Sequence, residues 1–336
     1  MNEIFFLGIF AINFLLIIFY ENIYKSINIF DKPDKIRKKH SAPVPLLTFL
    51  FIFLCFAWLI IFILYKYNLI YLYSILKIQT NKQFFILIFS ILLITFVGLY
   101  DDKFKIPVFK KIICLTLILY LNTNIDIGLR INEIYSIYFN KIFLLNNSSI
   151  IFTVFCIFAL INAMNMFDGI NIQVVFYFLL IFLYFIIKGM FTELSLTMLV
   201  PLFFILYLNI KNKIFLGDSG IYLITYIVSY VLIKSNNFIN KIAAEEIFFI
   251  FLIPALDMIR LFTYRLSKNL NPFIADTNHI HHILLRKIKF TNYILLIVSL
   301  IFSKFFIIFF FKEYLFFFYF AIITLYFYLV IKFKQV

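Results

Sequence analysis

The chain has 336 residues, of which 65% are hydrophobic and only 14% are charged. This composition excludes an ordinary soluble domain, in which about half of the residues are apolar and about a quarter are charged. The 30 Lys and Arg residues outnumber the 16 Asp and Glu residues. Such an excess suits an anionic membrane surface, a phosphorylated substrate or a nucleic acid, and bulk charge alone does not choose among them.

Apolar runs close to 20 residues long, enough to cross a bilayer as a helix, recur along the whole chain. The first run, roughly residues 4–20, lacks the basic start and the cleavage site of a signal peptide, so we interpret it as a membrane span. Hydropathy and breaker residues predict about eleven spans, centred near residues 12, 55, 92, 115, 157, 180, 202, 227, 253, 299 and 322. We therefore expect residues 1–336 to form a single, all-α, polytopic membrane domain of about 10 to 11 transmembrane helices.

The charged residues of the loops predict an orientation. If the N-terminus lies outside, the inner loops hold 20 of the 30 Lys and Arg residues, as the positive-inside rule requires. The same arrangement places eight of nine Asp residues inside and six of seven Glu residues outside. We expect the functional site on the cytoplasmic face of the inner membrane.

Two adjacent carboxylates, Asp101 and Asp102, end an apolar run in the segment VGLYDDKFKIP. At a separation near 5 Å and an effective dielectric of about 20 they repel by roughly 3 kcal/mol, which a divalent cation or neighbouring lysines would offset. For an isolated Asp pair, a charged helix end that stops translocation is an equally good explanation. Four lysines follow within ten residues, and they favour a functional site.

The segment NAMNMFDGIN carries Asn162, Asn165, Asp168 and Asn171, each three residues after the last. On a helix this spacing keeps the polar groups on one face. Amide and carboxylate oxygens are ligands that suit Mg²⁺, and Asn can also pair with the edge of a heterocycle. Hydrogen bonding between membrane helices is the alternative, and Gly169 disfavours it because it breaks the helix.

In the segment FLGDSG, Asp218 stands between Gly217 and Gly220 directly before an apolar run. A carboxylate at a helix start beside glycines suits a metal and phosphate site. Asp followed by Ser is also an ordinary helix N-cap, which is the simpler alternative for this segment alone.

Three histidines, His279, His281 and His282, cluster in the segment DTNHIHHILLRK. Zinc requires three or four ligands, and no nearby Cys or Glu completes such a set. Beside Arg286 and Lys287, the imidazoles are better suited to phosphate or substrate oxygens.

Two further features of the sequence limit the functions that the chain can have: the charged residues upstream of the histidines, and the absence of several known motifs. Asp257, Arg260 and Arg265 are expected to form structural ion pairs. The chain contains no P-loop, dinucleotide-binding, zincin or nucleophile-elbow motif, which excludes the corresponding enzyme classes.

Five segments taken in order closely resemble the motifs of the polyprenyl-phosphate N-acetylhexosamine-1-phosphate transferases: DKPDKIRKKHSAPVP, VGLYDDKFK, NAMNMFDGIN, FLGDSG and DTNHIHHILL. The resemblance implies a bundle of ten or eleven helices. It implies a UDP-N-acetylhexosamine donor, a polyprenyl phosphate acceptor such as undecaprenyl phosphate, Mg²⁺ with Mn²⁺ as a substitute, and release of UMP. The HxHH form is more similar to the branch that starts O-antigen, capsule or teichoic acid than to the peptidoglycan-precursor branch.

The resemblance also implies roles for individual residues. It places Mg²⁺ on Asp218 and Asn165, and catalytic groups at Asp101, Asp102 and Asp168. It places substrate-binding side chains at Lys111, Asn162, Asn171, His279, His281 and His282. The chain departs from the family pattern in having Leu46 and Leu47 where paired glycines are common, and Asn171-Ile172 where Asp-Gly or Asn-Gly is common.

Two other function classes remain to be weighed against a transferase. A cation-coupled transporter also carries Asp and Asn in its spans, but it needs them near the bilayer midplane rather than at one edge. A lipid-binding scaffold keeps the basic loops but does not need three separate Asp motifs. We expect no nucleic-acid partner, and the sequence leaves open whether the protein is a homodimer.

Overall fold

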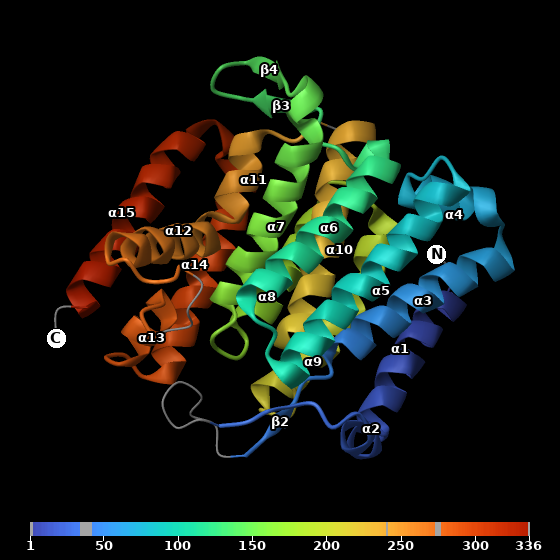
Figure 1. Cartoon of the computed structure of the whole chain (residues 1–336), viewed down its shortest axis with the longest axis horizontal. Helices are drawn as coiled ribbons and strands as arrows, with labels where there is room; N and C mark the ends of the chain where they lie inside the picture. Colours follow the sequence, from blue (N-terminus) through green and yellow to red (C-terminus); the bar gives the residue numbers. More distant parts are fainter. Residues whose placement is uncertain (1–2, 34–41, 240, 273–276, 335–336) are drawn as a thin grey trace.

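A computed structural model of the chain describes residues 3–33, 42–239, 241–272 and 277–334. The described part is mostly helical (Figure 1), which confirms the all-α prediction. The first six helices are α1 (Glu3–Ile18), α2 (Tyr20–Ile27), α3 (Thr48–Lys66), α4 (Leu69–Leu76), α5 (Asn81–Phe104) and α6 (Val108–Ile125). The middle of the chain contributes α7 (Ser149–Phe167), α8 (Gln173–Ile187), α9 (Thr192–Ile210) and α10 (Gly217–Phe238).

The last helices are α11 (Ala244–Ile250), α12 (Leu252–Ser267), α13 (Ile280–Leu285), α14 (Phe290–Phe310) and α15 (Leu315–Lys334). Two small antiparallel sheets pair β1 (Phe30–Asp31) with β2 (Val44–Pro45) and β3 (Glu133–Ser136) with β4 (Lys141–Leu144). Three short 3-10 turns complete the described elements: η1 (Ile127–Leu129), η2 (Asn146–Ser148) and η3 (Lys312–Tyr314). The β3–β4 hairpin lies at one end of the bundle, and β2, α2 and α13 lie at the other (Figure 1).

The number of membrane spans differs from the prediction, although each of the eleven predicted centres falls within a described helix. In the described part, seven helices are long and apolar enough to cross a bilayer: α3, α5, α6, α7, α9, α14 and α15. The count rises to nine if α1 with α2, and α11 with α12, each form one bent span. The structure thus supports seven to nine of the predicted 10 to 11 spans. Helix α8 is apolar but has only 15 residues, and α10 is not among the candidates.

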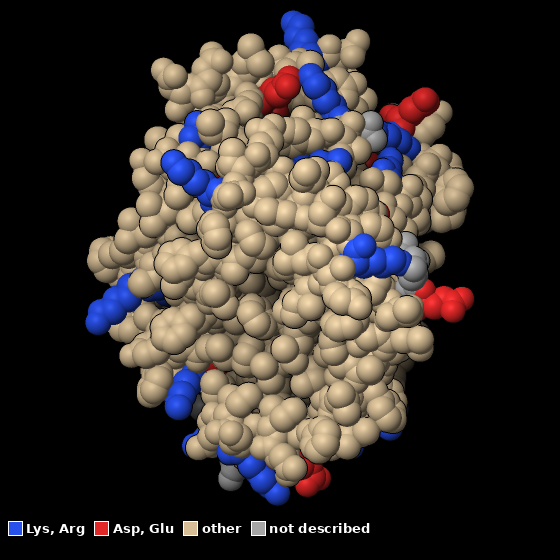
Figure 2. Space-filling model, turned by 90° about the vertical axis from the view of Figure 1, so that its right-hand side faces the viewer, with Lys and Arg blue, Asp and Glu red and all other residues tan. Residues whose placement is uncertain are grey.

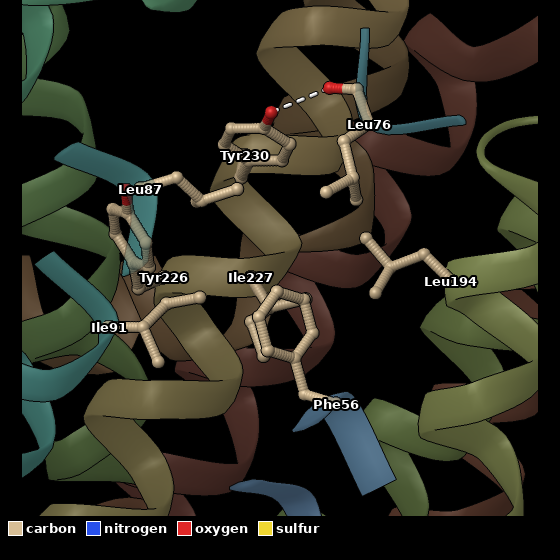
Figure 3. Close-up of a pocket in the computed structure, with 8 residues that line it drawn as sticks. All are labelled: Phe56, Leu76, Leu87, Ile91, Leu194, Tyr226, Ile227 and Tyr230. Carbon is tan, nitrogen blue, oxygen red and sulfur yellow. Dashed lines mark hydrogen bonds between the residues drawn. The ribbon is translucent and has the colours of Figure 1, made fainter. Parts of the chain in front are cut away.

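Helix α10 is the centre of the bundle. Residues 219–235 are all buried, and α10 packs against α3, α5 and α7. The close approach of α5 depends on Gly98, because a Cβ there would lie 2.6 Å from the backbone nitrogen of Ser219. Figure 3 shows part of this core, where the Tyr230 hydroxyl donates to the Leu76 carbonyl at 2.6 Å among apolar side chains. The side chains around α10 are closely packed here. The helix is therefore held rigidly, and its two ends lie at fixed positions.

The 75° bend between α11 and α12 has an identifiable cause. Pro254 has no amide hydrogen, so the Ile250 carbonyl, four residues earlier, lacks its helical donor. The side chains of Tyr177 and Lys304 donate to this carbonyl instead, the Lys304 amine at 2.7 Å. A lysine inside an apolar helix is thereby paired with the backbone oxygen that the bend releases.

The surface is that of a membrane protein. In the view of Figure 2, the centre of the face carries almost no charged side chain. Large apolar side chains stand exposed on the outside of the helices, for example Phe85 on α5 and Ile151 on α7, at 69% and 74% exposure. In water such a surface would be costly, whereas lipid accepts it. The chain is a multi-pass membrane protein, and the side of the membrane that each end faces stays a prediction.

Candidate active site

A cavity of about 1590 Å³ opens at the end of the bundle that carries β2 and α13. It is lined from the ends of α5, α7, α12 and α13, the starts of α6 and α10, and the loops between them. All eleven site residues predicted from the sequence line it: Asp101, Asp102, Lys111, Asn162, Asn165, Asp168, Asn171, Asp218, His279, His281 and His282. Segments about 180 residues apart in the chain therefore meet at one place.

Lys111 links two of the acidic motifs. Its amine contacts the carboxylate of Asp101, and it reaches Oδ2 of Asp218 at 3.2 Å. Asp101 also accepts the backbone amide of Ile106 at 2.7 Å, and the Tyr222 hydroxyl donates to Asp218 at 3.2 Å. The Asp218 side chain stays 22% exposed to the cavity. It is thus held in place while one side remains open to a ligand.

Asp102 supports the start of α10. Its carboxylate accepts the backbone amides of Asp218 and Ser219 at 2.8 and 3.1 Å, and the Ser219 hydroxyl at 2.8 Å. A negative side chain is favourable at a helix N-terminus. Gly217 adopts a φ of +68°, and a Cβ there would lie 2.7 Å from Asp102 Oδ2. The cap that the sequence suggested for Asp218 itself is therefore supplied by Asp102 from α5.

The polar residues of NAMNMFDGIN share the cavity but not one helical face. Asn162 and Asn165 lie on α7, whereas Asp168 is the residue after its last turn and Asn171 lies in the turn before α8. The prediction of one helical stripe is wrong for the last two, because the helix ends at Phe167. Burial, followed by the negative charges of Asp31 and Asp102, raises the pKa of Asp168 to about 7.

The turn before α8 is held by two asparagines that the sequence analysis did not single out. The Asn171 amide donates to the side chain of Asn212, and the Ile172 backbone amide donates to Oδ1 of Asn209 at 2.5 Å. Both partners lie at the end of α9 or just after it, in the segment LNIKNK. The only sequence signal for them was their position in a basic loop.

The three histidines pack together at the start of α13. His279 stacks on His281 with ring centroids 5.3 Å apart, and His281 lies 4.3 Å from His282. Gly169 packs directly on His281, because a Cβ there would lie 2.6 Å from Cδ2 and closer still to Cε1 and Nε2. This contact joins the turn after α7 to the histidine cluster.

Asp257 on α12 orients the histidine cluster. It accepts Nδ1 of His279 at 2.8 Å and the Ile280 amide at 3.1 Å. The Arg260 guanidinium and the Tyr326 hydroxyl also donate to it, at 2.8 and 2.7 Å. The predicted ion pair of Asp257 with Arg260 is confirmed. The role of Tyr326 was missed, since nothing distinguishes this tyrosine within the apolar run of α15.

The polar side chains of the cavity suit Mg²⁺, which needs few protein ligands, better than a metal ion that is coordinated by protein side chains alone. Among the described residues, no group of three His, Cys, Asp or Glu side chains is arranged to hold a metal ion. Magnesium commonly takes one or two protein carboxylates and completes its shell with water and phosphate oxygens. The cavity offers carboxylate oxygens on Asp101, Asp168 and Asp218 and side-chain amide oxygens on Asn162, Asn165 and Asn171.

Residues 84–236 match the model of glycosyl transferase family 4. The undecaprenyl-phosphate alpha-N-acetylglucosaminyl 1-phosphate transferase of Yersinia pestis is similar to this chain, with 26% identity over 313 residues, 85% of this chain and 76% of that protein. Proteins of the same name from Salmonella typhi and Escherichia coli strain K12 are 26% and 25% identical over 294 residues, which cover 83% of this chain and 75% of each relative. The family match includes every predicted site residue except the three histidines.

Proposed function

With residues 84–236 matching its model, the chain belongs to glycosyl transferase family 4, and we propose that it transfers an N-acetylhexosamine-1-phosphate from a UDP-sugar to a polyprenyl phosphate. UMP is the second product, and the lipid-linked sugar starts a cell-envelope polysaccharide. The observation that carries the proposal is the convergence of eleven polar residues from four motifs on one cavity at the end of an apolar bundle. A lipid phosphate from the bilayer and a soluble nucleotide from the aqueous phase can meet there.

The reaction exchanges one phosphate anhydride bond for another. An oxygen of the lipid phosphate attacks the β-phosphorus of the UDP-sugar, the bond between that phosphorus and the bridging oxygen breaks, and UMP leaves. A phosphate monoester with a second pKa near 6 is mostly a dianion at neutral pH, so the acceptor needs no strong general base. The protein's task is to bring two anions together in line.

We propose a separate role in this reaction for each group of side chains in the cavity. We assign Asp101 and Asp102 to the orientation of the acceptor, with Lys111 neutralising phosphate charge beside Asp101. The histidine cluster contributes ring N–H groups to phosphate or sugar oxygens, and Asn171 pairs with the uracil edge. Asn162 and Asp168 belong to the same wall of the cavity.

Asp218 and Asn165 are the residues that we propose for Mg²⁺, with Mn²⁺ as a substitute. The ion would offset charge on the donor pyrophosphate as the bond to UMP breaks. Asp218 is suited to the role because Lys111 and Tyr222 fix one of its oxygens while the side chain faces the cavity.

We infer that the cavity faces the cytoplasm of a bacterial cell, with the protein in the inner membrane, because 20 of the 30 Lys and Arg residues lie in the loops of that side in the predicted topology. Lys213 lies at the cavity end and Asn147 follows the β3–β4 hairpin at the other, and both are exposed. Single cysteines at these positions, in a chain lacking Cys55, Cys114 and Cys156, are treated with a membrane-impermeant thiol reagent in intact cells. Labelling of the cysteine at 147 supports the inference, and labelling of the one at 213 alone reverses it.

The proposed activity is tested with membranes that carry the chain, undecaprenyl phosphate, Mg²⁺ and a panel of labelled UDP-sugars. The expected result is label in the lipid fraction for a UDP-N-acetylhexosamine, and UDP-N-acetylglucosamine is the first to test because the relatives are named for that sugar. Lipid-linked label must depend on both Mg²⁺ and the acceptor. A panel that yields no lipid-linked label would refute the proposal.

A further inference from the structure

The turn that carries Asn171 contains a backbone conformation that its sequence does not favour. Ile172 has a φ of +78° and is the one β-branched residue with positive φ in the described ranges. Glycine adopts this region freely, whereas a β-branched side chain clashes with its own backbone there. The chain therefore needs a restraint that holds Ile172 in this conformation.

Asn209 supplies that restraint from the last turn of α9. Its side chain is buried, at 1% exposure. Its Oδ1 accepts the Ile172 amide at 2.5 Å, and this amide precedes the first turn of α8, where backbone donors have no helical partner. One side-chain oxygen thus both satisfies the donor and holds the residue whose φ is strained.

The nitrogen of the Asn209 side-chain amide contacts a second segment of the site. Nδ2 of Asn209 donates to the Ile214 carbonyl at 2.9 Å, four residues before Asp218. The next residue, Phe215, donates its own amide to the Pro45 carbonyl of β2 at 3.1 Å. Asn209 therefore joins the turn of Asn171 to the loop that leads into α10.

We propose that Asn209 is a positioning residue of the donor side of the cavity, which holds Ile172 in its strained conformation and so fixes Asn171 relative to Asp218. The proposal rests on the proposed function for the identity of the donor. Asn209 lies in the wall of the cavity, and both polar atoms of its side chain are engaged by the backbone. Its effect on turnover passes through the geometry of Asn171.

The test is a double-substitution cycle in the full-length purified protein, with Asn209→Ala, Ile172→Gly and the two combined. Asn209→Ala is expected to raise the KM for the UDP-sugar by about tenfold, the effect of losing a buried hydrogen bond of ordinary strength. The KM for undecaprenyl phosphate should change by less than about twofold, as a separate acceptor subsite requires. In the Ile172→Gly background the same loss should shrink to about threefold or less, because glycine needs no restraint at positive φ.

Two further variants separate positioning from general destabilisation. Asn237→Ala is a matched control, since the Asn237 side chain also makes two hydrogen bonds to the backbone, by donating to the carbonyls of Gly128 and Arg130, but at the opposite end of α10. It should leave the donor KM unchanged. Asn209→Asp keeps an oxygen for the Ile172 amide and should retain most of the donor affinity that Asn209→Ala loses. An unchanged donor KM in Asn209→Ala, or an equal loss with and without Ile172→Gly, would overturn the proposal.

The thermal midpoints of the four cycle proteins without ligand give an independent reading. Asn209→Ala should lower the midpoint more with isoleucine at position 172 than with glycine, and equal shifts would overturn the restraint. If the unaltered chain transfers no sugar from any UDP-sugar, the proposed function fails, while these midpoints still decide whether Asn209 restrains Ile172.

Discussion

Gly169→Ala should disable the site without unfolding the protein. The added Cβ would lie 2.6 Å from Cδ2 of His281 and closer to two other ring atoms, whereas carbon atoms pack at about 3.5 to 4 Å. His281 is buried at 1% exposure and its ring packs on His279 and His282. The ring must therefore move by about 1 Å or more, or the turn after α7 must retreat by as much. A displacement of that size at a reacting centre costs on the order of 100-fold in rate.

The assay compares kcat, both KM values and the thermal midpoint of the purified variant with those of the unaltered chain. Overpacking of this kind costs about 1 to 3 kcal/mol of stability. The variant should therefore stay folded and have a strongly lowered kcat.

Gly189→Ala is the matched control, because a Cβ at this position meets no atom within 4 Å. Its φ of +68° still makes alanine unfavourable, by roughly 1 kcal/mol. Gly189→Ala should thus lower stability and leave kcat unchanged. Full activity in Gly169→Ala would show that the turn and the histidine cluster do not touch in the working enzyme.

Three other predictions follow from the same site. Asp218→Asn should abolish both the activity and the Mg²⁺ dependence of UDP-sugar binding, because the amide lacks the charge that faces the cation. If a Mg²⁺ titration of UDP-sugar binding matches that of the unaltered chain, Asp218 does not belong to the metal site. Asp257→Asn should lower kcat by about 10- to 100-fold, because an amide oxygen accepts a weaker hydrogen bond from His279 than the carboxylate does. Tyr326→Phe should have a smaller effect in the same direction, and the reverse order would exclude Asp257 as the main support of His279. Donor incubated with protein and Mg²⁺ but no lipid acceptor should release no UMP, since the reaction is a single displacement, and stoichiometric UMP with label retained on the protein would establish a covalent intermediate.

The membership of the site could be predicted from the sequence because its motifs are local. Each one places Asp, Asn or His at the end of an apolar run, and helices that cross a bilayer bring such ends to one of only two surfaces. The helix ends that carry Asp101, Asp168 and Asp218 are therefore restricted to these two surfaces. The resemblance to a known family then grouped them into one site.

The contacts within the site could not be predicted in the same way. Nothing in the sequence near Asp102 indicates that it accepts the amides at the start of α10, more than 110 residues away. Tyr326 and Asn209 are equally ordinary in their own segments, and each becomes specific only through a distant partner. Periodicity reports which face of a helix is apolar, and it carries no information on which polar groups meet across helices.

The difference between the predicted spans and the seven to nine candidates has a similar origin. Hydropathy does not report where an apolar run lies in the bundle: the run of α10 is buried by α3, α5 and α7, and α8 has only 15 residues. Lys304 is a charged residue within the predicted span near residue 299. It is accommodated because Pro254, on a different helix, leaves the Ile250 carbonyl without a donor.

The central claim is that the chain moves a sugar together with its phosphate, and UDP-N-acetylglucosamine labelled at either phosphorus tests it most directly. Purified protein is incubated with undecaprenyl phosphate, Mg²⁺ and donor labelled in the α- or the β-phosphate. The account predicts that the β-label enters the lipid fraction and that the α-label is recovered as UMP. Recovery of both labels as soluble UDP, with the sugar on the lipid, would mean that the glycosidic bond is the one broken and would contradict the account.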